Sequence, residues 1–137
     1  AQGNASAQYN LGVMYRDGQG VVQNYVKARE WFEQAAAQGH AEAQYNLGWM
    51  YHYGRGVAQD YAKARKWYGQ AATQGLAKAQ YNLGWMYKSG RGGVQDYAKA
   101  REWLEKAAAQ TENVEDVENA AAVRKARRML EKIHWER

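Results

Sequence analysis

Apolar residues recur along the chain with the period of a helix, in short segments that glycines separate. In residues 41–53 the apolar stripe of a 3.6-residue helix consists of Ala43, Leu47, Met50 and Tyr51. In residues 60–75 the spacing i, i+3, i+4, i+7 holds Ala64, Trp67, Tyr68 and Ala71. Neither helix can bury its apolar stripe alone. The pattern therefore predicts paired amphipathic helices that pack against one another.

Small polar residues and glycines mark both ends of the predicted helices. A short oxygen acceptor that can cap free backbone N–H groups precedes each second helix, at Asn24, Asp60 and Asp96. Glycines suited to left-handed backbone follow the helices, at Gly54 and Gly90 after the first and at Gly39 and Gly75 after the second. Gly48 lies at the edge of the first stripe, where a missing side chain lets a neighbouring helix approach closely. Each unit is therefore expected to be a helical hairpin.

The hairpin pattern occurs three times. AQYNLGWMY is present at 43–51 and 79–87, and AQYNLGVMY is present at 7–15. Units 36 residues apart begin at Ala5, Ala41 and Ala77. The predicted repeats span 5–40, 41–76 and 77–110, and each hairpin buries its apolar face on the next. Residues 1–4 begin with AQG, as the end of repeat one does at 37–39, and are expected to be the remnant of a preceding repeat.

Residues 111–137 depart from the repeat, with Thr111 in place of the expected glycine. Residues 113–135 predict one longer helix, whose apolar stripe is Val123, Ala126, Leu130 and Ile133. Acidic residues lie early in this segment and basic residues late, which complements the dipole of a helix. A stack of hairpins needs a terminal cap with one polar face, and this helix is expected to be that cap.

The repeated letters resemble a known family. Four motifs with a 36-residue period over residues 1–110 carry the resemblance: A-x-x-x-L-G-x-x-Y, G-x-G-V, D-x-x-K-A-x-x-W-Y and A-A-x-Q-G. They resemble those of the Sel-one-like repeat (SLR) family, a relative of the tetratricopeptide repeats. The departures are Gly93 at the loop valine, and Phe32 and Leu104 where repeat two has Tyr68. The cysteine-bridged branch of the family is excluded because the chain has no cysteine.

The resemblance implies both a fold and a role. The implied fold is all-α, a right-handed α-α solenoid (superhelix) of helix-turn-helix repeats with a C-terminal capping helix, and the whole of residues 1–137 is expected to form one such domain. The implied role is that of a protein-interaction adaptor or scaffold. In bacteria such repeats often serve in envelope, secretion-linked or host-interaction settings.

In the tetratricopeptide-like families the first helices line the concave side of the superhelix. If this carries over, the groove is lined by three ladders of side chains and a positively charged edge. The ladders are Tyr9, Tyr45 and Tyr81; Asn10, Asn46 and Asn82; and Val13, Trp49 and Trp85, and the edge is Arg16, His52 and Lys88. Aromatic rings and amides suit an extended peptide, and the basic edge favours an acidic or carboxylate-bearing one.

Two interpretations of these rings stay open. They bind a ligand in the groove, or they pack against the next repeat and belong partly to the core. For the tryptophans the groove is favoured, because Val13 shows that the stack tolerates a small residue at the equivalent position. Carbohydrate binding through exposed Trp and Tyr, stacking of single-stranded nucleic acid, and self-association through the open N-terminal end remain as alternatives.

The sequence offers no catalytic or metal constellation. His40, His52 and His134 lie far apart in sequence, and Ser6 and Ser89 have no evident base. The GQG and GRG loops follow helices and lack the Lys-Ser/Thr of a phosphate loop, so Arg55 and Arg91 within them are expected to be solvated. We therefore expect no enzymatic activity, no cofactor and no metal.

Charge and composition narrow the partners further. The net charge of +5 is a mild excess, well short of a nucleic-acid-binding tract, and no apolar run is long enough to span a bilayer. A protein or peptide partner is therefore expected, with no membrane. The compartment stays open: periplasmic or secreted if an N-terminal leader was removed, and otherwise cytoplasmic.

Overall fold

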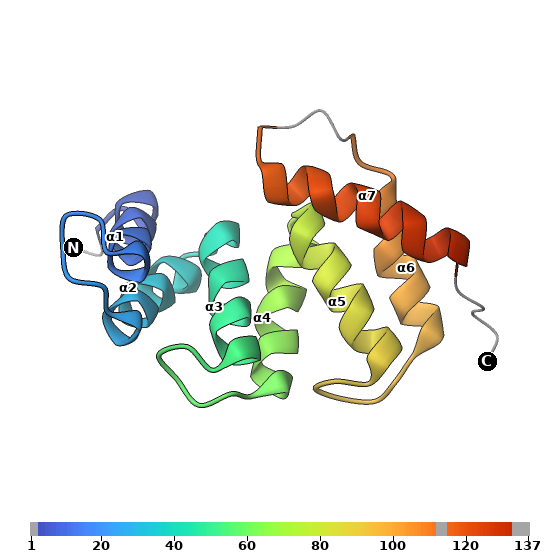
Figure 1. Cartoon of the computed structure of the whole chain (residues 1–137), viewed down its shortest axis with the longest axis horizontal. Helices are drawn as coiled ribbons and strands as arrows, with labels where there is room; N and C mark the ends of the chain where they lie inside the picture. Colours follow the sequence, from blue (N-terminus) through green and yellow to red (C-terminus); the bar gives the residue numbers. More distant parts are fainter. Residues whose placement is uncertain (1–2, 112–114, 133–137) are drawn as a thin grey trace. The chain divides into compact units, whose positions relative to one another are not determined.

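The chain folds into short helices joined by tight turns. The structure, a computed structural model, describes residues 3–111 and 115–132. These residues form seven helices and no strand (Figure 1): α1 (Ala5–Asp17), α2 (Tyr25–Ala37), α3 (Ala41–Tyr53), α4 (Tyr61–Thr73), α5 (Ala77–Ser89), α6 (Tyr97–Ala108) and α7 (Val117–Lys132). Each predicted repeat contributes two helices, which confirms the all-α architecture of helix-turn-helix units. The handedness of the superhelix stays a prediction.

The helix ends follow the predicted signals. The side-chain oxygens of Asn24, Asp60 and Asp96 each accept a hydrogen bond from the backbone N–H three residues later, at 3.0, 3.1 and 3.0 Å. Gly54 and Gly90 adopt left-handed backbone, with φ of 67° and 76°, and each donates its N–H to a methionine carbonyl in the last turn. These contacts end α3 and α5 where the sequence predicts.

A loop glutamine holds each hairpin turn in place, and the sequence alone did not reveal this role. Gln23, Gln59 and Gln95 each donate through Nε2 to a carbonyl in the last turn of the preceding first helix, at 2.7 Å in every repeat. The three acceptors are the carbonyls of Arg16, His52 and Lys88. Because the last carbonyls of a helix lack partners within it, these glutamines satisfy groups that would otherwise need water.

The chain contacts divide the molecule into two compact units, residues 1–67 and 68–137. The core of the first unit joins α2 and α3 and consists of Ala28, Phe32, Ala35, Ala36, Ala43, Leu47 and Met50. In α1, Gly12 lies so close to Phe32 that an added Cβ would lie 2.5 Å from a ring carbon. The missing side chain therefore lets α1 pack on α2, as was predicted for the equivalent Gly48.

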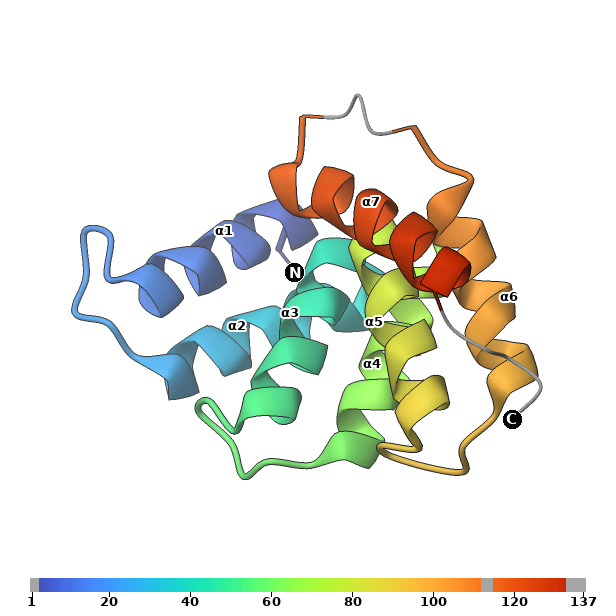
Figure 2. The same cartoon turned by 45° about the vertical axis from the view of Figure 1, so that its right-hand side comes forward.

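The second unit repeats this arrangement in α5 and α6. A Cβ added at Gly84 would lie 2.8 Å from Cγ of Leu104, which is fully buried. One core cluster here consists of Ala100, Leu104, Ala107 and Ala126. Ala126 belongs to α7, which lies across α5 and α6 in both cartoon views (Figures 1 and 2). The C-terminal helix therefore covers the last hairpin, as a cap should.

Buried glutamines connect each first helix to its surroundings. In the first unit, Gln38 donates to Oε1 of Gln8 at 2.7 Å, and Gln44 donates to the carbonyl of Ala36. In the second unit, the equivalent bonds join Gln110 to Gln80 at 2.8 Å and Gln80 to the carbonyl of Ala72. The repeated glutamine of AQYNLG is therefore a buried packing residue with a hydrogen-bond partner.

The helix α7 begins later than predicted. The carboxylate of Asp116 accepts hydrogen bonds from the backbone N–H groups of Glu118 and Asn119, so it precedes α7 and caps it instead of lying in its first turns. Val123 and Ala126 are fully buried, and Leu130 is partly buried, in agreement with the predicted stripe. Ile133 and His134 lie outside the described residues.

Polar contacts of Lys78 and Arg127 attach α7 to the last repeat. Nζ of Lys78, whose side chain is 7% exposed, forms ion pairs with Asp116 at 2.9 Å and with Glu118 at 3.2 Å. Arg127 donates to the carbonyls of Ala108 and Gln110, near the end of α6, at 2.9 and 2.8 Å. The cap is therefore fixed to α5 at its start and to the end of α6 through its middle.

Candidate protein-binding surface

The predicted groove residues of repeat one lie on α1 and differ in exposure. Asn10 is exposed, whereas Tyr9, Val13 and Arg16 are half-buried. Tyr9 and Val13 pack against the core of the first unit, and the Tyr9 ring stacks on His40 with centroids 4.7 Å apart. His40 lies between α2 and α3. It also caps α3, because its Nδ1 accepts a hydrogen bond from the N–H of Ala43 at 3.2 Å.

The equivalent residues of repeat two are more deeply buried. Tyr45 and Asn46 are each only 7% exposed, so in this structure they present little surface to a ligand. For Tyr45 this burial agrees with the packing interpretation. The amide nitrogen of Asn46 is buried, and within the described part of the chain it has no hydrogen-bond partner. The tyrosines and asparagines of the three repeats are therefore not equally accessible.

The end of α3 carries an aromatic cluster of Trp49, His52, Tyr53 and Tyr61. The rings of His52 and Tyr53 are stacked at 4.4 Å with an angle of 9°, and Trp49 is tilted against Tyr53 at 5.3 Å. Tyr61, at the start of α4, meets His52 edge-on at 5.4 Å. Tyr53 is 52% exposed and Trp49 is half-buried, so the cluster combines fixed rings with accessible apolar surface.

On α5, Tyr81, Asn82, Trp85 and Lys88 are all half-buried. Arg91 lies over the ring of Trp85, with its guanidinium carbon 5.0 Å from the ring centroid. Arg91 is exposed, as expected, and its guanidinium is also attracted by the ring electrons of the indole face. A positive charge therefore lies directly beside one of the two predicted anchor tryptophans.

A hollow on α5 and α7 was not predicted. It has a volume of about 450 Å³ and is lined by Tyr81, Lys125, Arg128, Met129 and Lys132. Nζ of Lys125 lies 5.9 Å from the centroid of the Tyr81 ring. Burial raises the pKa of the Tyr81 hydroxyl, and the nearby charge of Arg128 opposes this rise. The basic run of residues 124–132 was visible in the sequence but was assigned only to the helix dipole.

The described residues contain no arrangement typical of a metal site or a membrane span. No group of three or more His, Cys, Asp or Glu side chains among them could hold a metal ion. Within the same residues, no helix is both long and apolar enough to cross a membrane.

Comparisons with known proteins agree with this architecture. The family model described as Sel1 repeat matches residues 5–40, 41–76 and 77–111. The search of the curated proteins finds no significant match.

Three solved bacterial proteins share this fold. The Sel1 repeat protein from Oxalobacter formigenes is 40% identical with a TM-score of 0.76, over 77% of this chain and 43% of that one. A protective antigen of uropathogenic Escherichia coli strains, c5321, which displays an SLR fold, is 47% identical with a TM-score of 0.76, over 78% of this chain and 23% of that one. The chain therefore spans less than half the length of these two proteins. Helicobacter pylori cysteine rich protein B is 23% identical with a TM-score of 0.63, over 74% of this chain and 79% of that one, and shares the fold.

Sel1 repeats typically bind protein partners, and proteins built from them generally act as non-catalytic interaction scaffolds. Three consecutive matches cover most of the sequence, and the hairpins, the capping residues and the structural neighbours all agree with them. The chain belongs to the Sel1 repeat family.

Proposed function

We propose that this chain binds an extended segment of a partner protein through aromatic side chains of its first helices, in the concave groove that the family resemblance implies. One observation carries the proposal. Val13 and Trp49 occupy equivalent positions and both pack against the core of the first unit. Since that core accepts a valine, the larger surface of an indole is not needed for packing. Trp49 and Trp85, both half-buried, are therefore available as anchors.

The surroundings of both tryptophans favour protein binding. Tryptophan and tyrosine are enriched among residues that dominate binding energy, especially where neighbouring groups hold them in place. Trp49 is held by Tyr53, and Trp85 is covered on one face by Arg91. The charge of Arg91, together with Lys88, favours a segment that carries carboxylates. Arg16 contributes less, because it is ion-paired with Asp17 at 2.8 Å.

The test uses the valine that the chain itself carries in repeat one. Peptides are selected from a display library on the intact chain, and the affinity of the best one is measured by fluorescence anisotropy. The double variant Trp49→Val, Trp85→Val is expected to weaken binding by at least about tenfold, since anchor residues typically contribute about 2 kcal/mol or more. Its circular dichroism spectrum is expected to stay helical.

The matched control is Trp103→Val on α6. Trp103 is a partly exposed tryptophan of a second helix, with Lys106 over its ring at 4.4 Å. Its replacement should leave the peptide affinity unchanged. If the double variant binds as tightly as the original chain, the tryptophans are not the anchors and the proposal fails. A glycan array on the same proteins tests the carbohydrate alternative, which predicts binding that salt does not weaken.

A further inference from the structure

The helix α7 carries five basic side chains, and the structure separates them by role. Arg127 is used to bind the end of α6, through the carbonyls of Ala108 and Gln110. Lys125, Arg128 and Lys132 instead line the hollow, and all three are exposed. Among the residues that the structure describes, these three make no ion pair with an acidic side chain. Their charge is therefore available to a ligand.

From this arrangement we infer that the hollow on α5 and α7 is a docking site for an acidic peptide segment. An apolar side chain of the segment lies on Tyr81 and Met129, and its flanking carboxylates meet Lys125, Arg128 and Lys132. The inference rests on the proposed function and deepens it, because it names the chemistry of the partner. It also gives the cap helix a part in binding.

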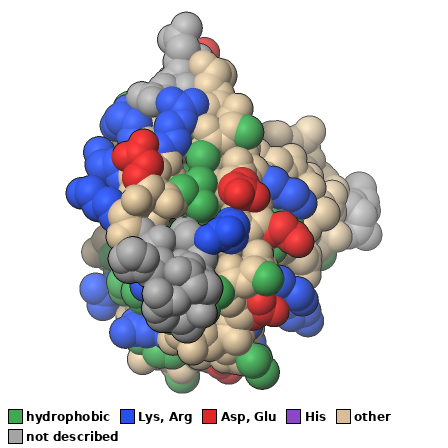
Figure 3. Space-filling model, turned by 90° about the vertical axis from the view of Figure 1, so that its right-hand side faces the viewer, with side chains coloured by type: hydrophobic (Ala, Val, Ile, Leu, Met, Phe, Trp, Pro, Cys, Tyr) green, Lys and Arg blue, Asp and Glu red, His purple; other side chains and the backbone are tan. Residues whose placement is uncertain are grey.

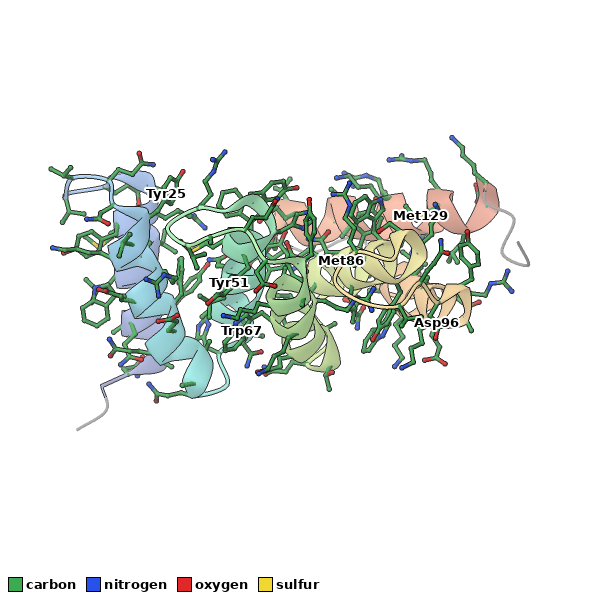
Figure 4. All side chains as sticks on the ribbon, turned by 90° about the horizontal axis from the view of Figure 1, so that it is seen from below. Tyr25, Tyr51, Trp67, Met86, Asp96 and Met129 are labelled. Atoms are coloured by element: carbon green, nitrogen blue, oxygen red, sulfur yellow. The ribbon has the colours of Figure 1, made fainter. Side chains whose placement is uncertain are left out.

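The floor of the hollow suits an apolar anchor. Met129 is half-buried against the core cluster of α6 and α7, so its position is fixed by packing. Figure 4 labels this residue on α7. Tyr81 is also half-buried, with its ring below Nζ of Lys125, and its hydroxyl can donate a hydrogen bond to a carboxylate. The hollow, about 450 Å³ in volume, is wide open to solvent, so a side chain bound in it stays partly exposed.

The charge balance around the hollow favours anions. The described part of α7 contains two acidic residues, Glu118 and Glu131. Glu118 is paired with Lys78, so within the described part of α7 only Glu131 remains to oppose the three cations of the hollow. Figure 3 shows Lys and Arg side chains gathered at the upper left of the face that it draws, with few acidic side chains among them. Rim charges of one sign mainly raise the association rate and select partners of opposite charge.

An acidic peptide fits the hollow better than single-stranded nucleic acid does. Proteins that bind single strands stack successive bases on several aromatic rings along a basic track. A single ring, that of Tyr81, is present among the lining residues, and a lysine lies over it. The combination of one apolar floor with three cations around it matches one apolar side chain between carboxylates.

The test measures binding of a defined probe to the full chain. The probe is a fluorescein-labelled peptide with a central leucine flanked on both sides by glutamates, and its counterpart has glutamine in place of every glutamate. The acidic peptide is expected to bind at low salt and to weaken as salt rises, and the neutral one to bind at least about tenfold more weakly. The variant Lys125→Gln, Arg128→Gln is expected to weaken the acidic peptide by about tenfold or more.

The matched control is Lys63→Gln, Lys66→Gln, which removes the same net charge from exposed positions of α4. It should change the affinity by less than about twofold, because neither lysine lines the hollow. The inference is overturned if both double variants lose affinity for the acidic peptide equally, or if neither loses any. The inference is also overturned, in favour of a nucleic-acid site, if a single-stranded oligonucleotide binds the chain more tightly than the acidic peptide does and the α7 variant no longer binds that oligonucleotide.

One further comparison separates this inference from the proposed function. The library-selected peptide is measured against the α7 variant and against Trp49→Val, Trp85→Val. If only the tryptophan variant loses that peptide, and the acidic probe binds the α7 variant normally, the scaffold proposal stands and the α7 site does not. If the α7 variant loses the acidic probe while the tryptophan variant still binds every selected peptide, the α7 site is supported and the tryptophan anchors are not.

Discussion

At the residue scale, the identical letters of the repeats have different causes. The glycine of AQYNLG is fixed by helix packing, because Gly12 and Gly84 face Phe32 and Leu104 at distances that leave no room for a Cβ. The glutamine is fixed by buried hydrogen bonds, of which Gln80 is an example, with one bond accepted and one donated. Within the nine repeated letters only the position of Val13, Trp49 and Trp85 varies, and the core of the first unit accepts both a valine and an indole there.

The glycine argument leads to a stability prediction. Gly12→Ala is expected to destabilise the chain by about 1–3 kcal/mol, because the added methyl group must displace the Phe32 ring. Gly69→Ala is the matched control, since Gly69 is within α4 and an added Cβ meets nothing within 4 Å. It should stabilise the chain by about 0.5–1 kcal/mol through helix propensity. Urea unfolding followed by circular dichroism measures both, and stabilisation by Gly12→Ala would contradict the packing argument.

Sequence alone predicted the local residue roles and missed the distant ones. The caps at Asn24, Asp60 and Asp96 act on N–H groups three residues away, so the spacing was sufficient to find them. The bond between Gln38 and Gln8 spans 30 residues, and the stack of Tyr9 on His40 spans one residue more. Such partners depend on which helices pack together, which local spacing does not specify.

At the element scale, α7 shows how one helix can carry both charged side chains that fix it to its neighbours and charged side chains that can bind a ligand. The sequence predicted its stripe, its polarity and its role as a cap, because these depend on periodicity and on the order of charges. It did not separate Arg127, which binds carbonyls at the end of α6, from Arg128, which lines the hollow. Adjacent residues on a helix point in directions about 100° apart, so their surroundings differ even where their chemistry does not.

The attachment of α7 to α5 should depend on pH. Burial would raise the pKa of Asp116, but the hydrogen bond and charge of Lys78, with the N–H groups of Asn119 and Glu118, outweigh it and hold the pKa below its usual value. A carboxyl whose pKa is lowered by folding stabilises the folded state above its unfolded pKa. This contribution is lost as pH falls through the folded pKa. When the pH is lowered below about 4, the melting temperature of the chain is therefore expected to decrease.

Lys78→Met isolates this contribution. Methionine keeps much of the buried aliphatic volume and removes the charge, so the acid-induced loss of stability should be shallower than in the original chain. Asp17 also has a lowered pKa, first because of its hydrogen bond to Arg16, and it contributes equally to both proteins. Thermal unfolding between about pH 7 and pH 3 provides the comparison, and identical pH profiles would contradict the role of Lys78.

At the scale of the whole molecule, near-identical repeats do not give identical surfaces. Eight residues of α3 are buried but only two of α1, although the two helices share most of their sequence. Tyr45 is 7% exposed whereas Tyr9 and Tyr81 are half-buried. The sequence predicted equivalent side chains at equivalent positions, and their orientation on each helix follows from periodicity. Their accessibility depends on place in the array, which the repeat pattern does not encode.

Two compact units with separate cores should also differ in their response to a core mutation. In repeat proteins, stability is approximately a sum of terms from each repeat and its neighbours. Leu104→Ala removes a fully buried side chain from the second unit and is expected to cost about 2–5 kcal/mol. Backbone amides of α5, α6 and α7 should lose protection from hydrogen exchange, while those of α1 and α2 change less.

Phe32→Ala is the reciprocal variant, because Phe32 is fully buried in the core of the first unit. It should reduce protection mainly in α1, α2 and α3 and leave α6 and α7 closer to the original chain. Hydrogen exchange followed by mass spectrometry resolves these segments in both variants. A uniform loss of protection along the whole chain in either one would show that the two units unfold as a single cooperative block. The cap helix would then stabilise every repeat, and not only the hairpin that it covers.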